Sequence, residues 1–362
     1  MNWYWRPLAP RDPAPVKETL APLVPELLTI SGKLSDGSEL AARVTQLIET
    51  YQLPIDESLF ARWIGDESVA AGTRVAALQA LDHRQSDKLP GSIDASLASM
   101  TAALRIAARD ILRRQQPERA TRLLSEVLTS PQSDRVEQQA ALQALGTIDT
   151  PEASERLQSW ADQLEQGSVV PTLQWDLVRA LRASPSEPLR LRIAAMEAQL
   201  TATDSDALLR MTQHGGDAAR GRNLFVNHAA AQCLRCHKHG GVTGSAHTNT
   251  GGTAGPELTD IAKRHPNQLR NYIWRSLLDP KAEIAKGYET VTLALIDGRV
   301  VAGVVLEENP ERIRLKQTDG QLIEIPTKEI DDRSPPNSAM PSMRTTLTPE
   351  DLRDLVEFLA GE

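Results

Sequence analysis

The sequence predicts a mainly α-helical protein, with an N-terminal α-solenoid followed by a second helical domain that carries a small β-rich insert. Three observations predict this class. Apolar residues recur at three- and four-residue spacing from about residue 15 to residue 200, as in amphipathic helices. An alanine-rich motif returns several times within that region. From residue 288 to residue 330 the spacing changes to that of strands.

The composition bounds the class of protein. A chain of 362 residues has room for two or three domains, and 40% hydrophobic with 24% charged residues is typical of soluble globular proteins. The net charge of -8 and the lack of a Lys/Arg-rich run give no indication of a nucleic-acid partner. No stretch of about 18 apolar residues occurs, so we expect no membrane span in this chain.

The alanine-rich motif at residues 74–81 is found again at 105–108, 139–145 and 192–195. Ala76, Ala107 and Ala140 are 31 and 33 positions apart, and Ala194 follows after 54. Small residues at such a period let stacked helical pairs pack closely. We therefore interpret residues 15–205 as HEAT-like helical repeats, after an N-terminal extension of residues 1–14. The alternative is an irregular helical bundle in which Ala and Leu are simply common.

Cys233, Cys236 and His237 form a C-x-x-C-H motif. Two thiols at this spacing reach the two vinyl groups of one haem, and the adjacent imidazole then lies over the iron. The sequence thus predicts one covalently attached haem c. The two cysteines are the only ones in the chain, which excludes a zinc site made mainly of thiolates. A thioredoxin-like thiol pair is the alternative, but no βαβ pattern precedes Cys233.

Two helices are expected to flank this motif. The first covers residues 217–231, with Gly221 and Phe225 on one face. The last begins at Thr348, an N-cap residue followed by proline at the first helical position. Its apolar face consists of Leu352, Leu355, Val356, Phe358 and Leu359.

The order of motifs along residues 217–362 resembles the planctomycete/verrucomicrobial-type haem-binding domain, a cytochrome c-like domain usually found at the C-terminus of large exported proteins. The matching elements are Gly-x-x-x-Phe, C-x-x-C-H, Gly-Pro-x-Leu at 255–258, Leu-Asp-Pro at 278–280, a β segment, Met-Pro at 340–341 and a closing helix. The resemblance implies a cytochrome c-like helical haem domain over residues 206–362. In that family helical repeats often precede the haem domain.

The resemblance also implies roles for single residues. The Pro256 carbonyl would accept the ring N–H of His237, which fixes the tautomer of the ligand, and Leu258 belongs to the same loop. Met340 would be the sixth ligand of the iron, because a thioether there favours the ferrous form. Met343 is its nearest rival, and His265 or His247 would give a bis-histidine site. The predicted haem-binding residues are Cys233, Cys236, His237, Pro256, Leu258 and Met340, with His237 and Met340 on the iron.

The sequence departs from the family in one connection. Residues 240–255 form a Gly/Thr/Ser-rich stretch that is longer than usual and carries His247. It could cover a haem edge, but we expect a solvated loop. The family often has a β-propeller further upstream, and none is found in this chain, so a dehydrogenase activity does not carry over.

The β-rich insert is expected at residues 286–331. Asp297-Gly298 lies between two β-rich runs, which is a strong hairpin signal. A second pair, residues 313–316 and 322–325, surrounds Asp319-Gly320. We expect four or five strands with a structural or docking role.

These observations predict a monohaem electron carrier rather than an enzyme, because two filled axial positions leave no open site for a substrate. The alternatives are the electron-accepting C-terminal part of a larger exported sugar or alcohol dehydrogenase, and a haem-containing interaction scaffold or sensor. The expected partner is a redox protein or an upstream dehydrogenase domain. Haem c is normally attached outside the cytoplasm, so we expect a periplasmic or otherwise exported protein. Residues 1–7 do not begin a secretory signal, which suggests a fragment or a mis-set start.

Overall fold

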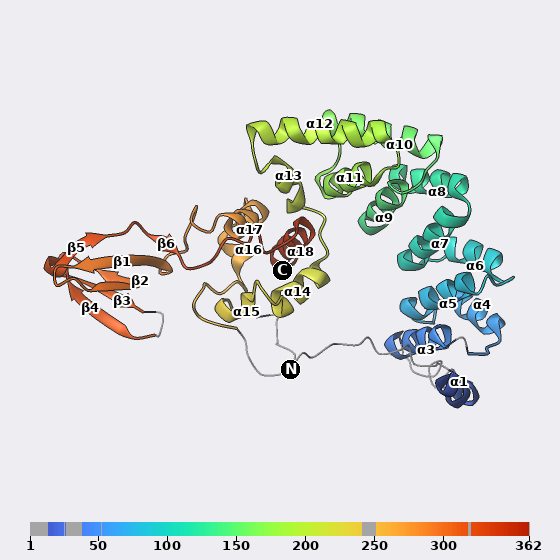
Figure 1. Cartoon of the computed structure of the whole chain (residues 1–362), viewed down its shortest axis with the longest axis horizontal. Coiled ribbons are helices and arrows are strands. Elements are labelled where there is room, and N and C mark those ends of the chain that lie inside the picture. The colour runs from blue at the N-terminus through green and yellow to red at the C-terminus, as the bar shows by residue number, and fades with distance from the viewer. Residues whose placement is uncertain are drawn as a thin grey trace, which may run out of the picture. The chain divides into compact units, whose positions relative to one another are not determined.

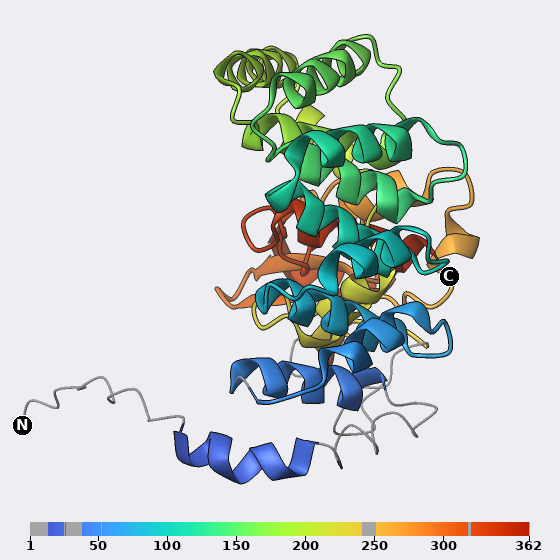
Figure 2. The same cartoon turned by 90° about the vertical axis from the view of Figure 1, so that its right-hand side faces the viewer.

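The computed structural model describes residues 14–24, 26, 38–51, 53–240, 251–317 and 320–361. It is mainly helical with a small antiparallel sheet, as the sequence predicts. The chain divides into two compact units. Unit 1 consists of Met1–Ser168 and Asp176–Ala195, and unit 2 of Val169–Trp175 and Met196–Glu362. Figures 1 and 2 follow the elements of each unit along the chain.

Helices joined by short loops make up the first half of the chain (Figure 1). Several begin at a conventional cap: the carboxylates of Asp56 and Asp134 and the hydroxyl of Thr150 each accept a backbone N–H of the first turn. In chain order they are α1 (Ala14–Leu20), η1 (Ala21–Leu23), α3 (Ser38–Thr50), α4 (Glu57–Gly65), α5 (Ala71–His83), α6 (Leu89–Leu97), α7 (Ala102–Gln115), α8 (Pro117–Thr129), α9 (Arg135–Leu145), α10 (Pro151–Glu165), α11 (Pro171–Ala183) and α12 (Glu187–Thr203).

The recurring alanines occupy equivalent places in α5, α7 and α9. Ala77, Ala108 and Ala141, each next to one of the alanines of the motif, are at most 1% exposed. They have the same separations of 31 and 33 residues. The fourth occurrence of the motif differs, because Ala194 and Ala195 are exposed on α12. Three of the four copies therefore share one packing position.

Polar side chains connect these helices at the same period. Arg105 of α7 donates to Glu137 of α9, which lies 32 residues further along the chain. Arg114 of α7 donates to Asp82 of α5, again 32 residues away, with an Nη2 to Oδ2 distance of 2.8 Å. Gln143 of α9 donates to Asp176 of α11 over 33 residues. These bonds thus link α5 to α7, α7 to α9 and α9 to α11.

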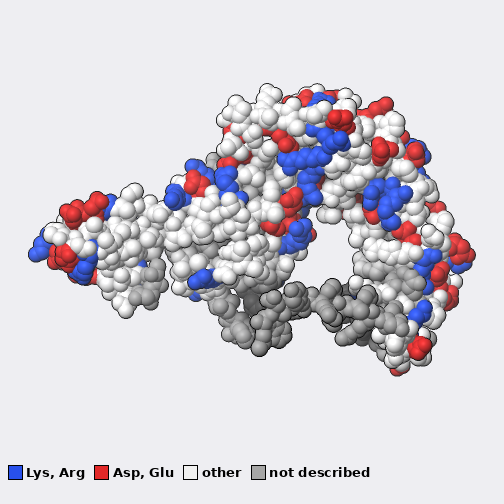
Figure 3. Space-filling view, in the orientation of Figure 1, with Lys and Arg blue, Asp and Glu red and all other residues white. Residues whose placement is uncertain are grey.

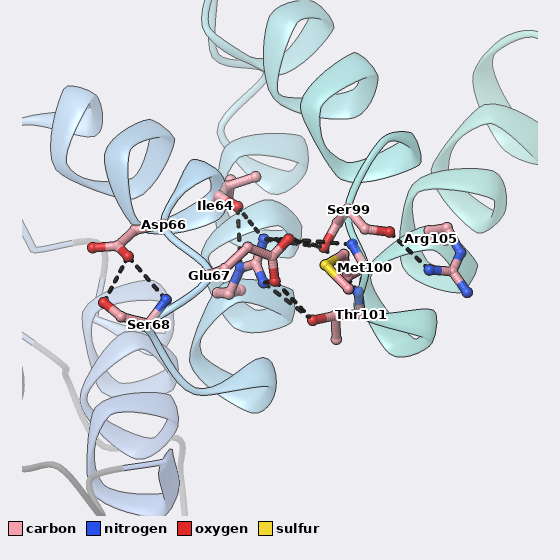
Figure 4. A network of polar contacts seen from close by, with 9 residues as sticks. Ile64, Asp66, Glu67, Ser68, Ser99, Met100, Thr101 and Arg105 are labelled. Atoms are coloured by element: carbon pink, nitrogen blue, oxygen red, sulfur yellow. Dashed lines mark hydrogen bonds and ion pairs between the residues drawn. The ribbon is translucent and has the colours of Figure 1, made fainter.

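A network around Glu67 joins two loops in the same way (Figure 4). Its carboxylate accepts the hydroxyl of Ser99 at 2.7 Å and the backbone N–H of Met100 at 3.2 Å. It also pairs with Arg74, whose side chain is buried and donates to the carbonyl of Ile64. The buried Arg74 charge thereby has a carboxylate and a carbonyl as partners, as a buried charge requires.

Unit 2 contains the helices α13 (Ala207–Arg210), η2 (Met211–Gln213), α14 (Ala218–Asn227), α15 (Cys233–Cys236), α16 (Ile261–Arg264), α17 (Leu269–Leu278) and α18 (Pro349–Ala360). Thr348 caps α18 as predicted, and it forms a capping box with Asp351. The predicted apolar face of α18 is buried in a core that it shares with Phe225 and residues of α17.

The two helices that flank the motif cross. A Cβ atom added to Gly221 of α14 would lie 2.0 Å from the carbonyl oxygen of Asp354 in α18, so the two backbones touch. The rings of Phe225 and Phe358 pack beside this point, with their centroids 5.7 Å apart. The first helix is shorter than the predicted 217–231. It ends at Asn227 because His228 is extended and its Nδ1 accepts the N–H of Ala231.

The sheet has the strand order β4-β3-β2-β1-β5, and β6 pairs with β1. The strands are β1 (Glu289–Leu295), β2 (Val300–Glu308), β3 (Arg312–Lys316), β4 (Leu322–Pro326), β5 (Ile330–Arg333) and β6 (Asn337–Ser338), with η3 (Thr327–Glu329) before β5. Gly298 has a φ of 85° between β1 and β2, as the predicted hairpin requires. The second predicted pair is also present, although Asp319 lies outside the described residues. The sheet continues to Ser338, past the predicted end of the insert at 331.

One face of the sheet covers a core of Val291, Leu293, Leu295, Ile313, Leu315 and Ile325. Charges of both signs are interspersed over the strands and over the helices of unit 1 (Figure 3). On the strands they form ion pairs such as Arg312 with Glu324 and Arg333 with Glu308. Among the described helices, none combines the length and the apolar character needed to cross a bilayer.

Candidate functional site

A cavity of about 500 Å³ lies within unit 2. Its wall is mostly apolar and comes from α14 to α18 and from the segments between them. All of the predicted site residues line it, although they come from three separate segments of the chain. They are Cys233, Cys236, His237, Pro256, Leu258 and Met340. The volume and the apolar wall are typical of a cofactor pocket.

The two cysteines are presented by α15, which has only one turn. Gln232 precedes it in the left-handed region, at φ 45° and ψ 46°, a conformation that a residue other than glycine rarely adopts. The N–H of His237 donates to the carbonyl of Cys233 at 2.9 Å and closes the turn. Both thiols and the imidazole therefore line the same cavity.

The ring of His237 is held by one hydrogen bond. Its Nδ1 lies 2.8 Å from the carbonyl oxygen of Pro256. A carbonyl can only accept, so Nδ1 carries the proton and Nε2 keeps the lone pair that a metal would bind. Burial lowers the pKa of His237, and the Pro256 contact opposes this shift only in part. The imidazole is thus neutral at pH 7, as a metal ligand must be.

Three glycines bring the following segment against the motif. A Cβ on Gly255 would lie 2.6 Å from Cε1 of His237, and one on Gly252 would lie 1.9 Å from the carbonyl oxygen of Arg235. Gly251 has a φ of 99° and touches the His237 carbonyl in the same way. The N–H groups of Gly252 and Gly255 donate back to residues 234 and 236. The described end of the predicted solvated loop is thus packed against the motif. His247 lies outside the described residues.

The Cys233 thiol differs from that of a redox pair. Burial raises the pKa of Cys233 to about 11, with Cys236 as a further charge that raises it. Reactive thiols in C-x-x-C motifs have lowered pKa values. The described residues before α15 also contain no strand, and both findings disfavour the thioredoxin-like alternative.

Two methionines line the cavity from the segment before α18. Met340 is half-buried, and its N–H donates to the Ser338 hydroxyl at 3.2 Å. Met343 is 6% exposed, belongs to the core, and donates its N–H to the carbonyl of Leu277. Met343 is thus a packed core residue, while Met340 lies at the edge of that core.

Two further histidines follow His237 within the described residues. His239 is 2% exposed and packs on the rings of Phe225 and Phe358, so it belongs to the core. His265 lines the cavity and stacks on Tyr272, with the ring centroids 3.4 Å apart.

His265 and Tyr272 belong to a polar part of the cavity wall, of which the sequence analysis named His265 alone. We call it the polar wall of the cavity, and it consists of Arg264, His265, Tyr272, Ser276, Glu283 and Lys286. Its members come from α16, α17 and the segment after α17. No local motif marks them, because only the packing of these segments brings them to one wall.

Comparison with family models and with curated proteins finds no match for this chain. Within the described residues, no group of three or more His, Cys, Asp or Glu side chains is placed to hold a metal ion.

Proposed function

We propose that unit 2 is a monohaem c-type cytochrome domain that carries electrons one at a time. The observation that carries the proposal is the shared cavity: two thiols, a neutral imidazole and a thioether line one apolar space of about 500 Å³. The residues present fit a haem. The two thiols, the imidazole and the thioether are the groups that covalent attachment and axial ligation need. Because Gly255 has no side chain, its backbone can lie against the His237 ring without a clash.

Each residue has a separate part in this proposal. Cys233 and Cys236 would form the thioether links, and His237 would offer Nε2 to the iron. Pro256 holds the ring and raises the basicity of the imidazole through the Nδ1–H bond. Met340 would supply the thioether ligand, which its half-buried place at the edge of the core supports better than the core position of Met343.

The haem, when bound, supplies the one-electron chemistry, and the chain sets its potential. The wall of the cavity includes the apolar side chains of Phe225, Leu277, Leu355 and Leu359. A low-dielectric wall disfavours the more highly charged ferric form, and a thioether ligand acts in the same direction. Both features support a carrier with a raised potential. Covalent attachment also supports an exported location, with a redox protein as its partner.

We also propose that the helices of unit 1 form a HEAT-like solenoid. The buried alanines at 31- and 33-residue separations support this, and so do the polar bonds over 32 and 33 residues. In a solenoid each repeat contacts its neighbours. The bonds that link α5 to α7, α7 to α9 and α9 to α11 are contacts of that kind.

The test is expression of the full chain together with the haem-attachment machinery, followed by intact mass and absorption spectroscopy. We expect the mass of one haem on the wild type. The Cys233→Ser, Cys236→Ser double variant should lose it under denaturing conditions. Ser96→Ala, a small substitution in α6 of unit 1, is the control and should keep the haem. A wild type without covalent haem would contradict the proposal.

A further inference from the structure

The charged part of the cavity wall has no role in the ligand set described above. Among the described residues that line the cavity, those with a formal charge at pH 7 are Arg264, Glu283 and Lys286. All three are exposed, so they lie at the rim rather than deep in the wall. Tyr272, His265 and Ser276 lie beside them and are half-buried.

A haem carries two carboxylates, the propionates, on the edge opposite its two vinyl groups. If the vinyl groups met Cys233 and Cys236, the carboxylates would meet another part of the cavity wall. An ionised carboxylate cannot enter an apolar wall without a charge or hydrogen-bond partner. The chain would therefore have to offer donors on that wall, from elements other than α15.

We propose, as a consequence that rests on the proposed haem site, that the polar wall of the cavity binds the two propionates, with Arg264 and Lys286 as cations and Tyr272 as a hydroxyl donor. The charge count supports this. Two cations against the single carboxylate of Glu283 leave the rim positive before the propionates enter, in a chain whose net charge is -8.

The donors are held in place by contacts on the described chain. Nη2 of Arg264 donates to the carbonyl of Glu257 at 2.5 Å, which ties the guanidinium to the loop that also holds His237. This bond engages one of its five N–H groups. The ring of Tyr272 stacks on His265 at an interplanar angle of 14°. Burial, and then the charge of Glu283, raises the pKa of Tyr272, so its phenol remains a donor at pH 7.

Arg264→Gln and Lys286→Gln test the assignment, each beside a neighbouring cation that does not line the cavity. The controls are Lys263→Gln, whose side chain is 81% exposed and paired with Asp260, and Lys281→Gln, which is also exposed. The first measurement is a potentiometric titration. Each removed cation at the propionates should lower the ratio of reduced to oxidised protein at a fixed ambient potential by roughly threefold to tenfold. Both controls should stay within about twofold of the wild type, because neither side chain lines the cavity.

The second measurement is the resonance Raman bending mode of the propionates, which reports their hydrogen bonding directly. It should shift in Arg264→Gln and Lys286→Gln, stay in place in both controls, and return towards the wild type in Arg264→Lys. If Arg264→Gln fails to mature, Lys286→Gln and Arg264→Lys carry the test.

The two proposals fail in different ways. Covalent haem in every variant, with potentials and propionate modes equal to those of the controls, would overturn the propionate assignment alone. A wild type without haem would overturn the cytochrome proposal and this inference together.

Discussion

Gly221 of α14 meets Asp354 of α18 so closely that a Cβ on the glycine would lie 2.0 Å from the aspartate carbonyl oxygen. The two helices can cross here only because one of them has no side chain at the contact. Phe225 and Phe358, which pack beside this contact, belong to the core of unit 2, and Phe225 also lines the cavity.

Gly221→Ala should therefore separate the helices and lower the free energy of unfolding by about 2 kcal/mol or more. Gly91→Ala in α6 is the matched control. Nothing lies within 4 Å of a Cβ at Gly91, so this change should be neutral or raise stability by up to about 1 kcal/mol. Denaturant unfolding of the full chain measures both. Equal effects of the two substitutions would argue against the crossing.

Met340→Ala and Met343→Ala should have opposite consequences. Loss of Met340 should remove the weak red absorption band of methionine–iron ligation in the ferric form while changing stability little. Loss of Met343, which is buried in the core, should keep the band and lower stability by about 2–4 kcal/mol. The band and the unfolding midpoint are measured on the same haem-loaded samples. A red band that is lost only in Met343→Ala would reverse the two roles.

The acid stability of unit 1 should depend on Glu67. Its pKa is lowered from 4.5 to about 2, first by the hydrogen bond from Arg74 and then by that from Ser99. A folded pKa below the unfolded value means that the carboxylate stabilises the fold above pH 4.5. This contribution is lost as the pH falls from 4.5 to about 2.

Hydrogen exchange of the peptides around Glu67 and Ser99 measures this. Protection in the wild type should fall across that pH window. Glu67→Gln should have lower protection at pH 7 and a flatter pH dependence. Glu118→Gln, an exposed change in α8, should follow the wild type. Parallel pH curves for the wild type and Glu67→Gln would show that the network does not control acid stability.

Glu137 and Glu165 both pair with arginines of another helix, but in different surroundings. Glu137 has 4% of its side chain exposed and pairs with Arg105 and Arg109, while Glu165 is 43% exposed and pairs with Arg192. Glu137→Gln should lower the free energy of unfolding by about 3 kcal/mol, because it leaves two half-buried cations with one neutral acceptor. Glu165→Gln should lower it by less than about 1 kcal/mol. Similar losses from both would mean that burial does not set the strength of these pairs.

Features whose signal is local could be predicted from the sequence. The N-cap at Thr348 and the Asp297-Gly298 hairpin each depend on a few adjacent residues. Gly221 and Phe225 were expected on one helix face, and both are buried on α14. In each case the chemistry of a short stretch restricts the backbone to few arrangements.

Features made by distant segments could not be predicted. Nothing in the sequence near Glu67 indicates that Ser99 will donate to it, and Tyr272 carries no sign of its place beside the cavity. From the sequence we expected Gly251 and Gly252 to lie in a solvated loop. Their backbone instead lies against residues 235 and 237. Such contacts depend on the register between segments, which periodicity leaves open.

The short strand β6 has a further consequence for the topology of the chain. It pairs with the start of β1, so that Glu289 and Ser338 are direct partners across the ladder. The polypeptide therefore leaves the helical core and returns to it at neighbouring points. Long excursions whose ends meet add little closure entropy to the domain that carries them. The whole β excursion can thus be lengthened, shortened or exchanged between related chains while the spacing of the segments on either side stays the same.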